Sequence, residues 1–312
     1  MIKLSFIVPF YNVEQYIEQC IRSLYKQDIS LDEYEVICID DCSPDGSRAV
    51  VEHLKKEFPT LRLLRTPENL RQGGARNLGI KQAQGKYIWF VDSDDTIEPN
   101  CLRGLLNNAE EYDTDLLRFY FNEPESYDKM IKYGVCSGSE LVFDAPMHLT
   151  PEQRCCSVVP SIVKRQLLID NNLFFTEKVQ YEDDDYAYMF YALSQRALLL
   201  PLPLYNVRQR QGSTTRQQYT IQTMHYLAAQ IERLVQKEPQ LSSIDKRWYN
   251  LVKKSILWTA QGQILPNVEN LSQNDKQMFF NQHIGKIKGL SKFVSIKTYL
   301  QISYQTFYNL LK

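Results

Sequence analysis

Apolar runs alternate with amphipathic stretches along the first hundred residues of the chain. The apolar runs have the length of buried strands, and the stretches between them repeat their apolar side chains at helical spacing. The expected strands are residues 4–9, 35–39, 61–64 and 87–91, and the expected helices are 13–26, 72–84 and one that ends at Lys56. Strands that alternate with helices of about 10–15 residues predict right-handed βαβ units and therefore a parallel sheet.

The pattern changes twice further along the chain. Residues 113–144 are irregular and rich in Tyr and Phe, which favours strands and a covering insertion. The remaining expected elements are helices at 163–172 and 184–195, an extended segment at 197–205, and helices at 219–236, 244–265 and 296–311. Because only helices are expected beyond Ser213, we predict an α/β domain over residues 1–215 and a C-terminal helical region over 216–312.

Charge is divided unevenly between these two regions. Residues 216–312 carry 13 Lys and Arg against 5 Asp and Glu, whereas residues 1–215 carry 23 against 32. The whole chain has a net charge of −1, with 44% hydrophobic and 23% charged residues, which is ordinary for a globular protein. The acidic part would suit a metal site, and the basic part would suit an anionic surface. We expect no nucleic-acid partner.

The sequence shows no pattern typical of export or of membrane insertion. No apolar run reaches the roughly 18 residues that a spanning helix needs. The apolar start of the chain is interrupted at Pro9 and Asn12, which favours a strand over a signal peptide. The seven Cys are therefore expected to be reduced, which indicates the cytosol.

Three carboxylates follow the fourth expected strand, at Asp92, Asp94 and Asp95. Two unit charges about 4 Å apart repel by roughly 4 kcal/mol at an effective dielectric near 20, so something must offset this cost. A bound Mg²⁺ or Mn²⁺ would do so, since these ions prefer oxygen ligands completed by water and phosphate. The alternative is a solvated acidic loop before the helix that follows Pro99, and it suits Asp95 best.

Polar side chains also follow two other expected strands, and parallel strands would bring all three sets to one crevice. Tyr11 and Asn12 follow the first strand, and Asp40 and Asp41 follow the second. A carboxylate at a strand end can accept the imide N–H of a uracil, so Asp41 is a candidate for binding the base. Asp45 fits an ordinary turn that caps the next helix.

A glycine pair opens the third expected helix. Gly73 and Gly74 allow close backbone approach where helix N–H groups favour anions, and Arg76 and Asn77 follow within the first turns. Neither a Walker phosphate loop nor a dinucleotide-binding G-x-G-x-x-G pattern is present. The alternative is that the glycines mark a loop and tight packing of the helix on the sheet.

Two later clusters carry candidate chemistry. Glu182 and the three aspartates after it precede an expected helix; helix capping explains one or two of the four, and one could act as a general base. Arg208, Arg210 and Arg216 flank a Gly-Ser-Thr-Thr loop, which suits diphosphate recognition. The alternative for this loop is a basic linker into the helical region.

Together these motifs resemble the family 2 glycosyltransferases of the GT-A fold. The matching segments are SFIVPFYNVEQYIEQCIRSLYKQ, EVICIDDCSPDGS, ENLRQGGARNLGI, IWFVDSDDTIEPN, YEDDDYAYMF and VRQRQGST, in family order over about residues 3–215. The resemblance implies a Rossmann-like nucleotide-sugar-binding domain. It also implies inverting transfer of a hexose or N-acetylhexosamine from a nucleoside-diphosphate donor, expected to be UDP-linked, to an acceptor hydroxyl.

The resemblance also implies roles for individual residues. Asp183, in the Glu182–Asp183 doublet, would be the catalytic base, and Asp92 and Asp94 would bind Mn²⁺ or Mg²⁺, with Asp94 as the direct ligand. The implied donor-binding residues are Pro9, Tyr11, Asp41, Asn69, Arg76, Asp92, Arg208, Arg210 and Ser213. The chain has QRQGS where many processive members have Q-x-x-R-W, which favours a single-addition enzyme over a polymer synthase.

Two other classes of function stay open from the sequence. DSDDT resembles the D-x-D-x-T motif of haloacid-dehalogenase-type phosphatases, although that motif belongs on the first strand of its domain and three expected strands precede it here. The chain could also be a catalytically silent homologue that binds a sugar nucleotide without turnover. A donor-consumption assay separates these classes.

The stretch 281–312 contains five Lys and no acid, interleaved with apolar and aromatic residues. An amphipathic helix on an anionic membrane has this pattern, and so does a helix packed on the domain or a dimer contact. A membrane position would suit a glycan or lipid-linked acceptor in cell-surface polysaccharide synthesis. We therefore expect a cytoplasmic protein, with peripheral contact to the inner face of the cytoplasmic membrane and homo-oligomer formation as the open alternatives.

Overall fold

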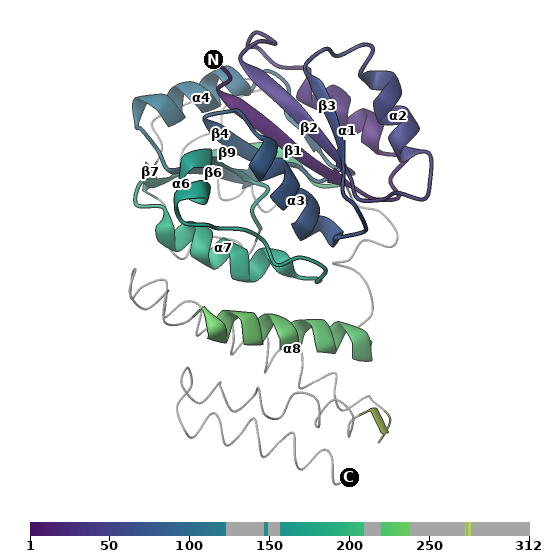
Figure 1. Cartoon of the computed structure of the whole chain (residues 1–312). Coiled ribbons are helices and arrows are strands. Elements are labelled where there is room, and N and C mark those ends of the chain that lie inside the picture. Colours follow the sequence, from purple (N-terminus) through teal and green to yellow (C-terminus); the bar gives the residue numbers. More distant parts are fainter. Residues whose placement is uncertain (123–146, 149–156, 209–219, 238–271, 273, 276–312) are drawn as a thin grey trace. The chain divides into compact units, whose positions relative to one another are not determined.

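Figure 1 shows the computed structural model of the chain, which describes residues 1–122, 147–148, 157–208, 220–237, 272 and 274–275. The chain divides into two compact units, Met1–Gln209 and Arg210–Lys312, and each is described by itself. The domain boundary expected after residue 215 falls within 209–219, outside the described residues, and stays a prediction.

The first unit is built on a sheet whose first half is parallel, with the strand order β3-β2-β1-β4. These strands are β1 (Leu4–Phe10), β2 (Tyr34–Asp40), β3 (Leu61–Arg65) and β4 (Tyr87–Phe90), and the helices between them are α1 (Ile17–Leu24), α2 (Ser47–Leu54) and α3 (Arg71–Gln82). The alternation of strands and helices that the sequence predicts over its first hundred residues is therefore confirmed.

The parallel sheet expected from the first hundred residues is confirmed, and the second half of the sheet, for which no strand direction was predicted, is mixed. β8 pairs antiparallel with both β4 and β6, β9 is parallel to β6, and the short β5 and β7 pair antiparallel with β9. These strands are β5 (Thr96–Ile97), β6 (Leu116–Phe121), β7 (Met147–His148), β8 (Ser161–Lys164) and β9 (Ala197–Asn206). Because β4 and β6 both oppose β8, they run in the same direction, and the carboxyl ends of β1, β2, β4, β6 and β9 share one edge.

The prediction of a helix at 163–172 is wrong for its first two residues. Ser161–Lys164 forms β8, and only then does α6 (Arg165–Asp170) begin. β8 lies between β4 and β6, and its Ile162 and Val163 side chains are fully buried. A short apolar run does not distinguish a buried strand from a buried helix, which explains the error. The other described elements of this region, α4 (Leu102–Glu111), α7 (Glu182–Leu193) and β9, complete the unit.

The strands β1 and β2 are buried on both faces of the sheet. All seven residues of β1 and all seven of β2 are buried, as is typical of parallel strands covered by helices. α3 packs across β1 and β2 (Figure 1). Gly79 permits this close approach, since a Cβ atom there would lie 2.4 Å from the Ile7 Cγ2 atom.

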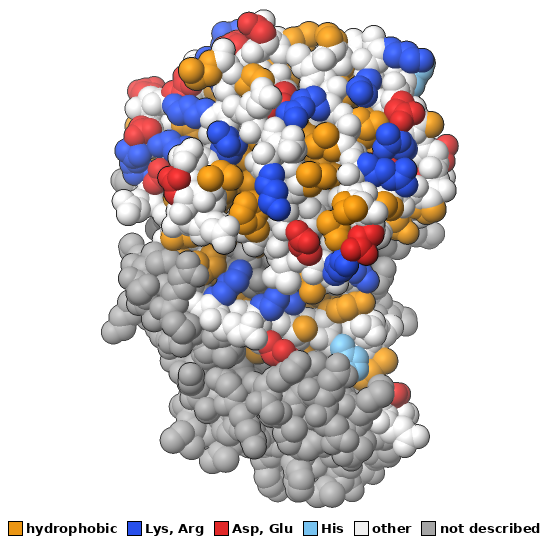
Figure 2. Space-filling view, in the orientation of Figure 1, with side chains coloured by type: hydrophobic (Ala, Val, Ile, Leu, Met, Phe, Trp, Pro, Cys, Tyr) orange, Lys and Arg blue, Asp and Glu red, His pale blue; other side chains and the backbone are white. Residues whose placement is uncertain are grey.

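The surface of the first unit carries charges of both signs. In Figure 2, Lys and Arg side chains are interspersed with Asp and Glu side chains over the described part of the visible face. The excess of acidic residues in 1–215 is therefore not gathered into one patch on this face. The described cysteines Cys20, Cys38, Cys42 and Cys101 are free.

In the second unit the structure describes α8 (Ile221–Gln236), which confirms the helix expected at 219–236. The helices expected at 244–265 and 296–311 lie outside the described residues, as does the basic stretch 281–312. Of the helices that the structure describes, none is long and apolar enough to cross a membrane.

Candidate active site

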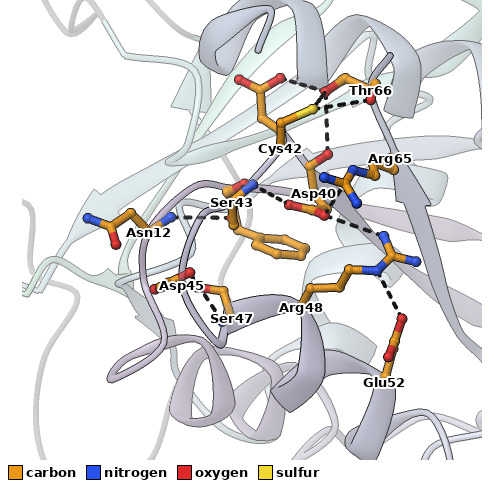
Figure 3. Close-up of polar contacts among 12 residues, drawn as sticks. Asn12, Asp40, Cys42, Ser43, Asp45, Ser47, Arg48, Glu52, Arg65 and Thr66 are labelled. Carbon is orange, nitrogen blue, oxygen red and sulfur yellow. Dashed lines mark hydrogen bonds and ion pairs between the residues drawn. The ribbon is translucent and has the colours of Figure 1, made fainter. Parts of the chain in front are cut away.

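The turn after β2 uses the first carboxylate of the Asp40–Asp41 pair for structure (Figure 3). Asp40 is fully buried, and its Oδ1 accepts a 2.8 Å hydrogen bond from the Ser43 backbone N–H. Its Oδ2 forms ion pairs with Arg48 at 3.3 Å and with Arg65 at 3.6 Å. Burying a charged carboxylate costs hydration free energy, and the ion pairs with Arg48 and Arg65 offset this cost. Asp40 therefore stabilises the turn.

Asp41, the residue expected to bind the base, is also buried. Its Oδ1 accepts a 2.8 Å hydrogen bond from the Thr66 hydroxyl and a 2.9 Å hydrogen bond from the Leu70 N–H, which orient the carboxylate. Pro9 is a buried residue of β1, and Tyr11, just beyond that strand, is 48% exposed. The structure therefore places these three residues at neighbouring strand ends, and their contact with a nucleotide stays a prediction.

Asp45 holds the start of α2, as the sequence predicts. Its Oδ1 accepts hydrogen bonds from the hydroxyl and the N–H of Ser47, the first residue of α2, at 2.6 and 3.2 Å. Its Oδ2 accepts the Glu14 N–H at 3.0 Å, and the Ser47 hydroxyl accepts the Val13 N–H at 2.9 Å. These bonds fix the segment after β1, where Tyr11 lies, against the turn after β2.

A buried arginine joins two acidic motifs that lie far apart in the sequence. Arg76, on α3, is fully buried. Its Nη2 donates to the Asp92 Oδ1 at 2.9 Å, and its Nη1 donates to the Glu182 Oε1 at 3.1 Å and to the Asp183 carboxylate. Burial lowers the pKa of Arg76, but the charges of Asp183, Asp92 and Glu182 outweigh it and raise the pKa above its usual value. The guanidinium therefore stays charged and orients the three carboxylates.

Two of the carboxylates around Arg76, those of Asp92 and Asp183, have raised pKa values. Burial raises the pKa of Asp92 to about 6, against the attraction of Arg76. Burial also raises the pKa of Asp183; Arg76 opposes this shift, and repulsion from Glu182 adds to it. A raised pKa makes a carboxylate a better proton acceptor near neutral pH, which is what a general base requires.

The four acids expected before a helix form the first turn of α7 instead. α7 begins at Glu182, after Tyr181 in a left-handed conformation with φ 56°. Acidic side chains are favoured at a helix N-terminus by the helix dipole. The helix dipole is not the only reason for acidic residues at this position, because Glu182 and Asp183 also bind Arg76.

Asp95 is buried in the turn after β4 and supports that turn. Its Oδ2 accepts a 2.9 Å hydrogen bond from the Tyr205 hydroxyl, and its Oδ1 accepts the Arg208 backbone N–H at 2.8 Å. The Tyr205 hydroxyl in turn accepts the Asp92 N–H at 2.9 Å. Burial raises the pKa of Asp95 to about 7, and the charge of Asp92 adds to the shift. The interpretation of Asp95 as a solvated loop residue is therefore wrong, since only 6% of it is exposed.

Asp92 and Asp94 have donor atoms that fit a divalent cation. They occupy alternate positions of the turn, and both are half-buried. The Asp92 Oδ1 accepts hydrogen bonds from Gln72 at 2.5 Å and from Arg76 at 2.9 Å, so both of these donors bind the same carboxylate oxygen. Within the described residues, no group of three or more His, Cys, Asp or Glu is arranged to hold a metal. Mg²⁺ and Mn²⁺ at phosphates commonly take one or two carboxylates and complete their coordination with phosphate oxygens and water.

Arg208, expected to contact the diphosphate, lies against the turn that carries Asp94 and Asp95. Its Nε donates to the Asp94 carbonyl oxygen at 3.0 Å. Its guanidinium also hydrogen-bonds to Gln19 and lies 5.4 Å from the centroid of the Tyr16 ring. The structure therefore brings this arginine to the expected metal pair.

Of three other expected donor-binding residues, the structure describes only Asn69. Asn69 is exposed before α3, where its Oδ1 accepts the Arg71 N–H at 3.2 Å. Arg210 and Ser213 fall within 209–219, outside the described residues. The donor-binding roles of these residues stay predictions.

The sequence reasoning missed two side chains that orient the acidic turn. Gln72 donates to the Asp92 carboxylate, and Tyr205 bridges Asp92 and Asp95. Gln72 directly precedes the glycine pair Gly73–Gly74, and this position could have marked it as a candidate site residue. Tyr205 lies at the end of an apolar strand and resembles an ordinary core residue. The neighbouring sequence therefore gives no sign that its hydroxyl binds the acidic turn.

The fold and the site together define a class of protein. The sheet with its parallel β3-β2-β1-β4 half, the helices between those strands and the carboxylate turn after β4 fit the GT-A glycosyltransferase class that the sequence motifs predict. Asp92 follows the fourth strand in the chain, which does not fit the first-strand position of a phosphatase nucleophile. The sequence model of glycosyl transferase family 2 matches residues 5–155, and this segment of the chain is a domain of that family.

Known proteins agree with this assignment. The poly(ribitol-phosphate) beta-N-acetylglucosaminyltransferase TarS of Staphylococcus aureus is 32% identical over 192 residues, which are 59% of this chain and 31% of that protein. The chain therefore matches about a third of the length of this relative. A crystal structure of S. aureus TarS 1–349 in complex with UDP-GlcNAc has the same fold, with a TM-score of 0.76 at 22% identity over 99% of this chain and 89% of that chain.

A more distant structure shares the fold as well. The mannosyltransferase PcManGT from Pyrobaculum calidifontis, in complex with GDP-Man and Mn²⁺, has a TM-score of 0.58 at 15% identity. The superposition covers 99% of this chain and 86% of that chain. The expected GT-A fold is therefore confirmed.

Proposed function

We propose that this chain is an inverting glycosyltransferase that moves a sugar from a UDP-linked donor to the hydroxyl of a glycan or lipid-linked acceptor. The observation that carries the proposal is the buried Arg76, which joins Asp92 to Glu182 and Asp183. One guanidinium thus holds together a carboxylate suited to a metal–diphosphate complex and a carboxylate suited to accepting a proton.

Asp183 is the base in this proposal. It takes the proton of the acceptor hydroxyl while that oxygen bonds to the anomeric carbon, and the bond from this carbon to the diphosphate oxygen breaks. Attack in line with the leaving group inverts the configuration at the anomeric carbon. Arg76 orients Asp183, and the neighbouring charge of Glu182 strengthens the affinity of Asp183 for the proton.

The donor lies along the carboxyl edge of the sheet in this proposal. Asp41 accepts the imide N–H of the uracil, and Arg208 stabilises the diphosphate as it gains negative charge. A Mn²⁺ or Mg²⁺ held by Asp92 and Asp94 would supply further positive charge at the same oxygens. The UDP-GlcNAc bound to TarS supports a UDP-linked donor, and the Mn²⁺ bound with GDP-Man in the mannosyltransferase supports a divalent metal.

The acceptor is proposed to be a glycan or lipid-linked glycan of the cell surface. The name of TarS specifies a poly(ribitol-phosphate) acceptor, which supports a polymeric acceptor for this chain. A cytoplasmic enzyme whose basic stretch 281–312 contacts the inner face of the cytoplasmic membrane would meet a lipid-linked acceptor there.

Flotation with anionic liposomes tests the membrane contact. The full chain should float with the liposomes, and a chain truncated at Leu290 should stay in the dense fraction. Equal flotation of the two chains would contradict a membrane role for the C-terminal stretch.

The transfer reaction is tested with a panel of UDP-sugars and Mn²⁺ by measuring UDP release with and without acceptor glycans. Asp183→Asn should lose transfer by about 100-fold or more and still bind donor in calorimetry. Asp170→Asn, at an exposed aspartate on α6, is the matched control and should keep the wild-type rate of transfer.

Transfer by Asp183→Asn near the wild-type rate would refute the base assignment. Donor binding without consumption would instead identify a silent homologue, and cleavage of a generic phosphomonoester would identify a phosphatase.

A further inference from the structure

One side chain of α3 binds the segment 173–178 that leads into α7. Asn77 is only 3% exposed. Its Nδ2 donates to the Phe175 carbonyl oxygen at 2.9 Å and to the Glu177 Oε1 at 3.1 Å, and its Oδ1 accepts the Phe175 N–H at 2.8 Å. The side-chain amide therefore pairs with both backbone groups of Phe175, as a neighbouring strand would.

Two further contacts hold the same segment against α3. Gly73 lies one turn before Asn77 on this helix, and a Cβ atom there would lie 2.6 Å from the Thr176 carbonyl oxygen. The Lys178 N–H donates to the Leu70 carbonyl oxygen at 2.9 Å. The backbone of 173–178 thus packs directly on α3, without an intervening side chain at Gly73.

The Phe175 ring connects this segment to the acidic cluster. It stacks on Tyr186 of α7, with ring centroids 3.6 Å apart and an interplanar angle of 8°. The guanidinium carbon of Arg76 lies 5.2 Å from the centroid of the same Phe175 ring. One ring therefore contacts both the helix that begins with Glu182 and Asp183 and the arginine that binds them.

We infer that Asn77 is a positioning residue for sugar transfer, which holds residues 173–178 so that α7 presents Asp183 to the acceptor hydroxyl. The inference rests on the proposed function, because it takes Asp183 as the base. The hydrogen bonds described for the Asn77 side chain go to Phe175 and Glu177, so its effect on Asp183 is indirect. A displacement of about 1 Å, even from a remote change, can lower a rate about 100-fold.

Asn77→Ala tests the inference, with Asn108→Ala as the matched control. Asn108 is also a buried asparagine on a helix, but its Nδ2 donates to the Gly104 carbonyl oxygen within α4. Asn77→Ala should lower kcat for transfer by about tenfold to 100-fold, while the donor KM and the Kd for UDP stay within about twofold. Asn108→Ala should leave these constants unchanged. A loss of kcat no larger than that of the control would overturn the inference.

Two other variants keep the inference testable if Asn77→Ala fails to fold. Glu177→Ala removes one of the three hydrogen bonds at an exposed position, and Gly73→Ala displaces the Thr176 carbonyl. Both should lower kcat and leave donor affinity unchanged. An unchanged kcat in both variants would overturn the inference.

Amide hydrogen exchange separates this inference from the proposed function. The Phe175 N–H should lose protection in Asn77→Ala and keep it in Asn108→Ala, whatever reaction the protein catalyses. Retained protection in Asn77→Ala would refute the contact on which the inference depends. If the wild-type protein transfers no sugar, the proposed function and the positioning role both fail, and the exchange result still shows whether Asn77 holds the segment.

Discussion

The Tyr205 hydroxyl donates a 2.9 Å hydrogen bond to the Asp95 carboxylate and joins the end of β9 to the turn after β4. The same hydroxyl accepts the Asp92 N–H at 2.9 Å. Tyr205 is fully buried, and burial raises the pKa of its hydroxyl, so the phenol stays protonated and able to donate. A residue from the second half of the sheet therefore orients the turn that carries the proposed metal ligands.

Tyr205→Phe should destabilise the fold and weaken donor binding. The change leaves the Asp95 carboxylate and the Asp92 N–H each without one hydrogen bond, and a buried polar group left unpaired costs about 1–3 kcal/mol. Urea unfolding measures the free energy of unfolding, and calorimetry measures Mn²⁺-dependent binding of UDP.

Tyr34→Phe is the matched control for this change. Within the described part of the chain the buried Tyr34 hydroxyl has no hydrogen-bond partner, so its removal should be nearly neutral. Equal losses of stability in the two variants would show that the Tyr205 hydrogen bonds contribute nothing specific.

Asp94→Ala should mainly affect metal-dependent donor binding, whereas Asp95→Ala should mainly affect stability. Asp94 is the proposed direct metal ligand, so its loss should abolish Mn²⁺-dependent donor binding and change stability little. Asp95 accepts hydrogen bonds from Tyr205 and Arg208, so its loss should lower the free energy of unfolding by about 2 kcal/mol and reduce donor binding less. Calorimetry with UDP, with and without Mn²⁺, and urea unfolding distinguish the two effects. The opposite pattern would make Asp95 the ligand.

Arg76→Ala should lower the free energy of unfolding by about 3–5 kcal/mol, because it removes a fully buried cation and leaves the buried Glu182 and the half-buried Asp92 and Asp183 without it. Lys3→Ala is the control, since Lys3 and Glu33 form a 2.9 Å ion pair that is partly exposed and worth about 0–1 kcal/mol. Urea unfolding at pH 7 measures both. A loss for Arg76→Ala as small as that of the control would mean that Arg76 does not hold the acidic cluster together.

Asp45 should make stability depend on pH in the acid range. Burial opposes ionisation of Asp45, but its hydrogen bonds to Ser47 and to the Glu14 N–H outweigh burial and lower its pKa below the usual 3.8. A pKa lowered by folding adds stability above the unfolded-state value, and this stability is lost as the pH falls through the folded-state value. Asp45→Asn should therefore be about 1 kcal/mol less stable than wild type near pH 7, with a difference that shrinks below about pH 4. A difference that does not change with pH would contradict this account.

The sequence by itself determined the local elements of the first unit and the kind of chemistry that it carries. Whether residues 4–9 or 35–39 form a strand depends on side chains that are neighbours in the chain, and such periodicity is visible without a structure. The polar residues after β1, β2 and β4 were also visible, and parallel strands bring their ends to one edge. The family segments added roles for Asp92, Asp94 and Asp183, which stay predictions.

Only the tertiary structure decided what each carboxylate contacts. Asp40 and Asp41 are adjacent in sequence, yet one binds Arg48 and Arg65 and the other binds Thr66 and Leu70. The same holds for β8, whose last two residues the apolar pattern assigned to a helix, because its partners β4 and β6 come from other parts of the chain.

The contacts that set the site join residues about a hundred positions apart: Tyr205 with Asp95, Arg76 with Asp183, and Asn77 with Phe175. Local pattern shows that a residue is polar or apolar, but burial and partner choice arise only when distant segments pack together. That is why the acids were recognised from the sequence, whereas the arginine, tyrosine and asparagine contacts that orient them emerged only from the fold.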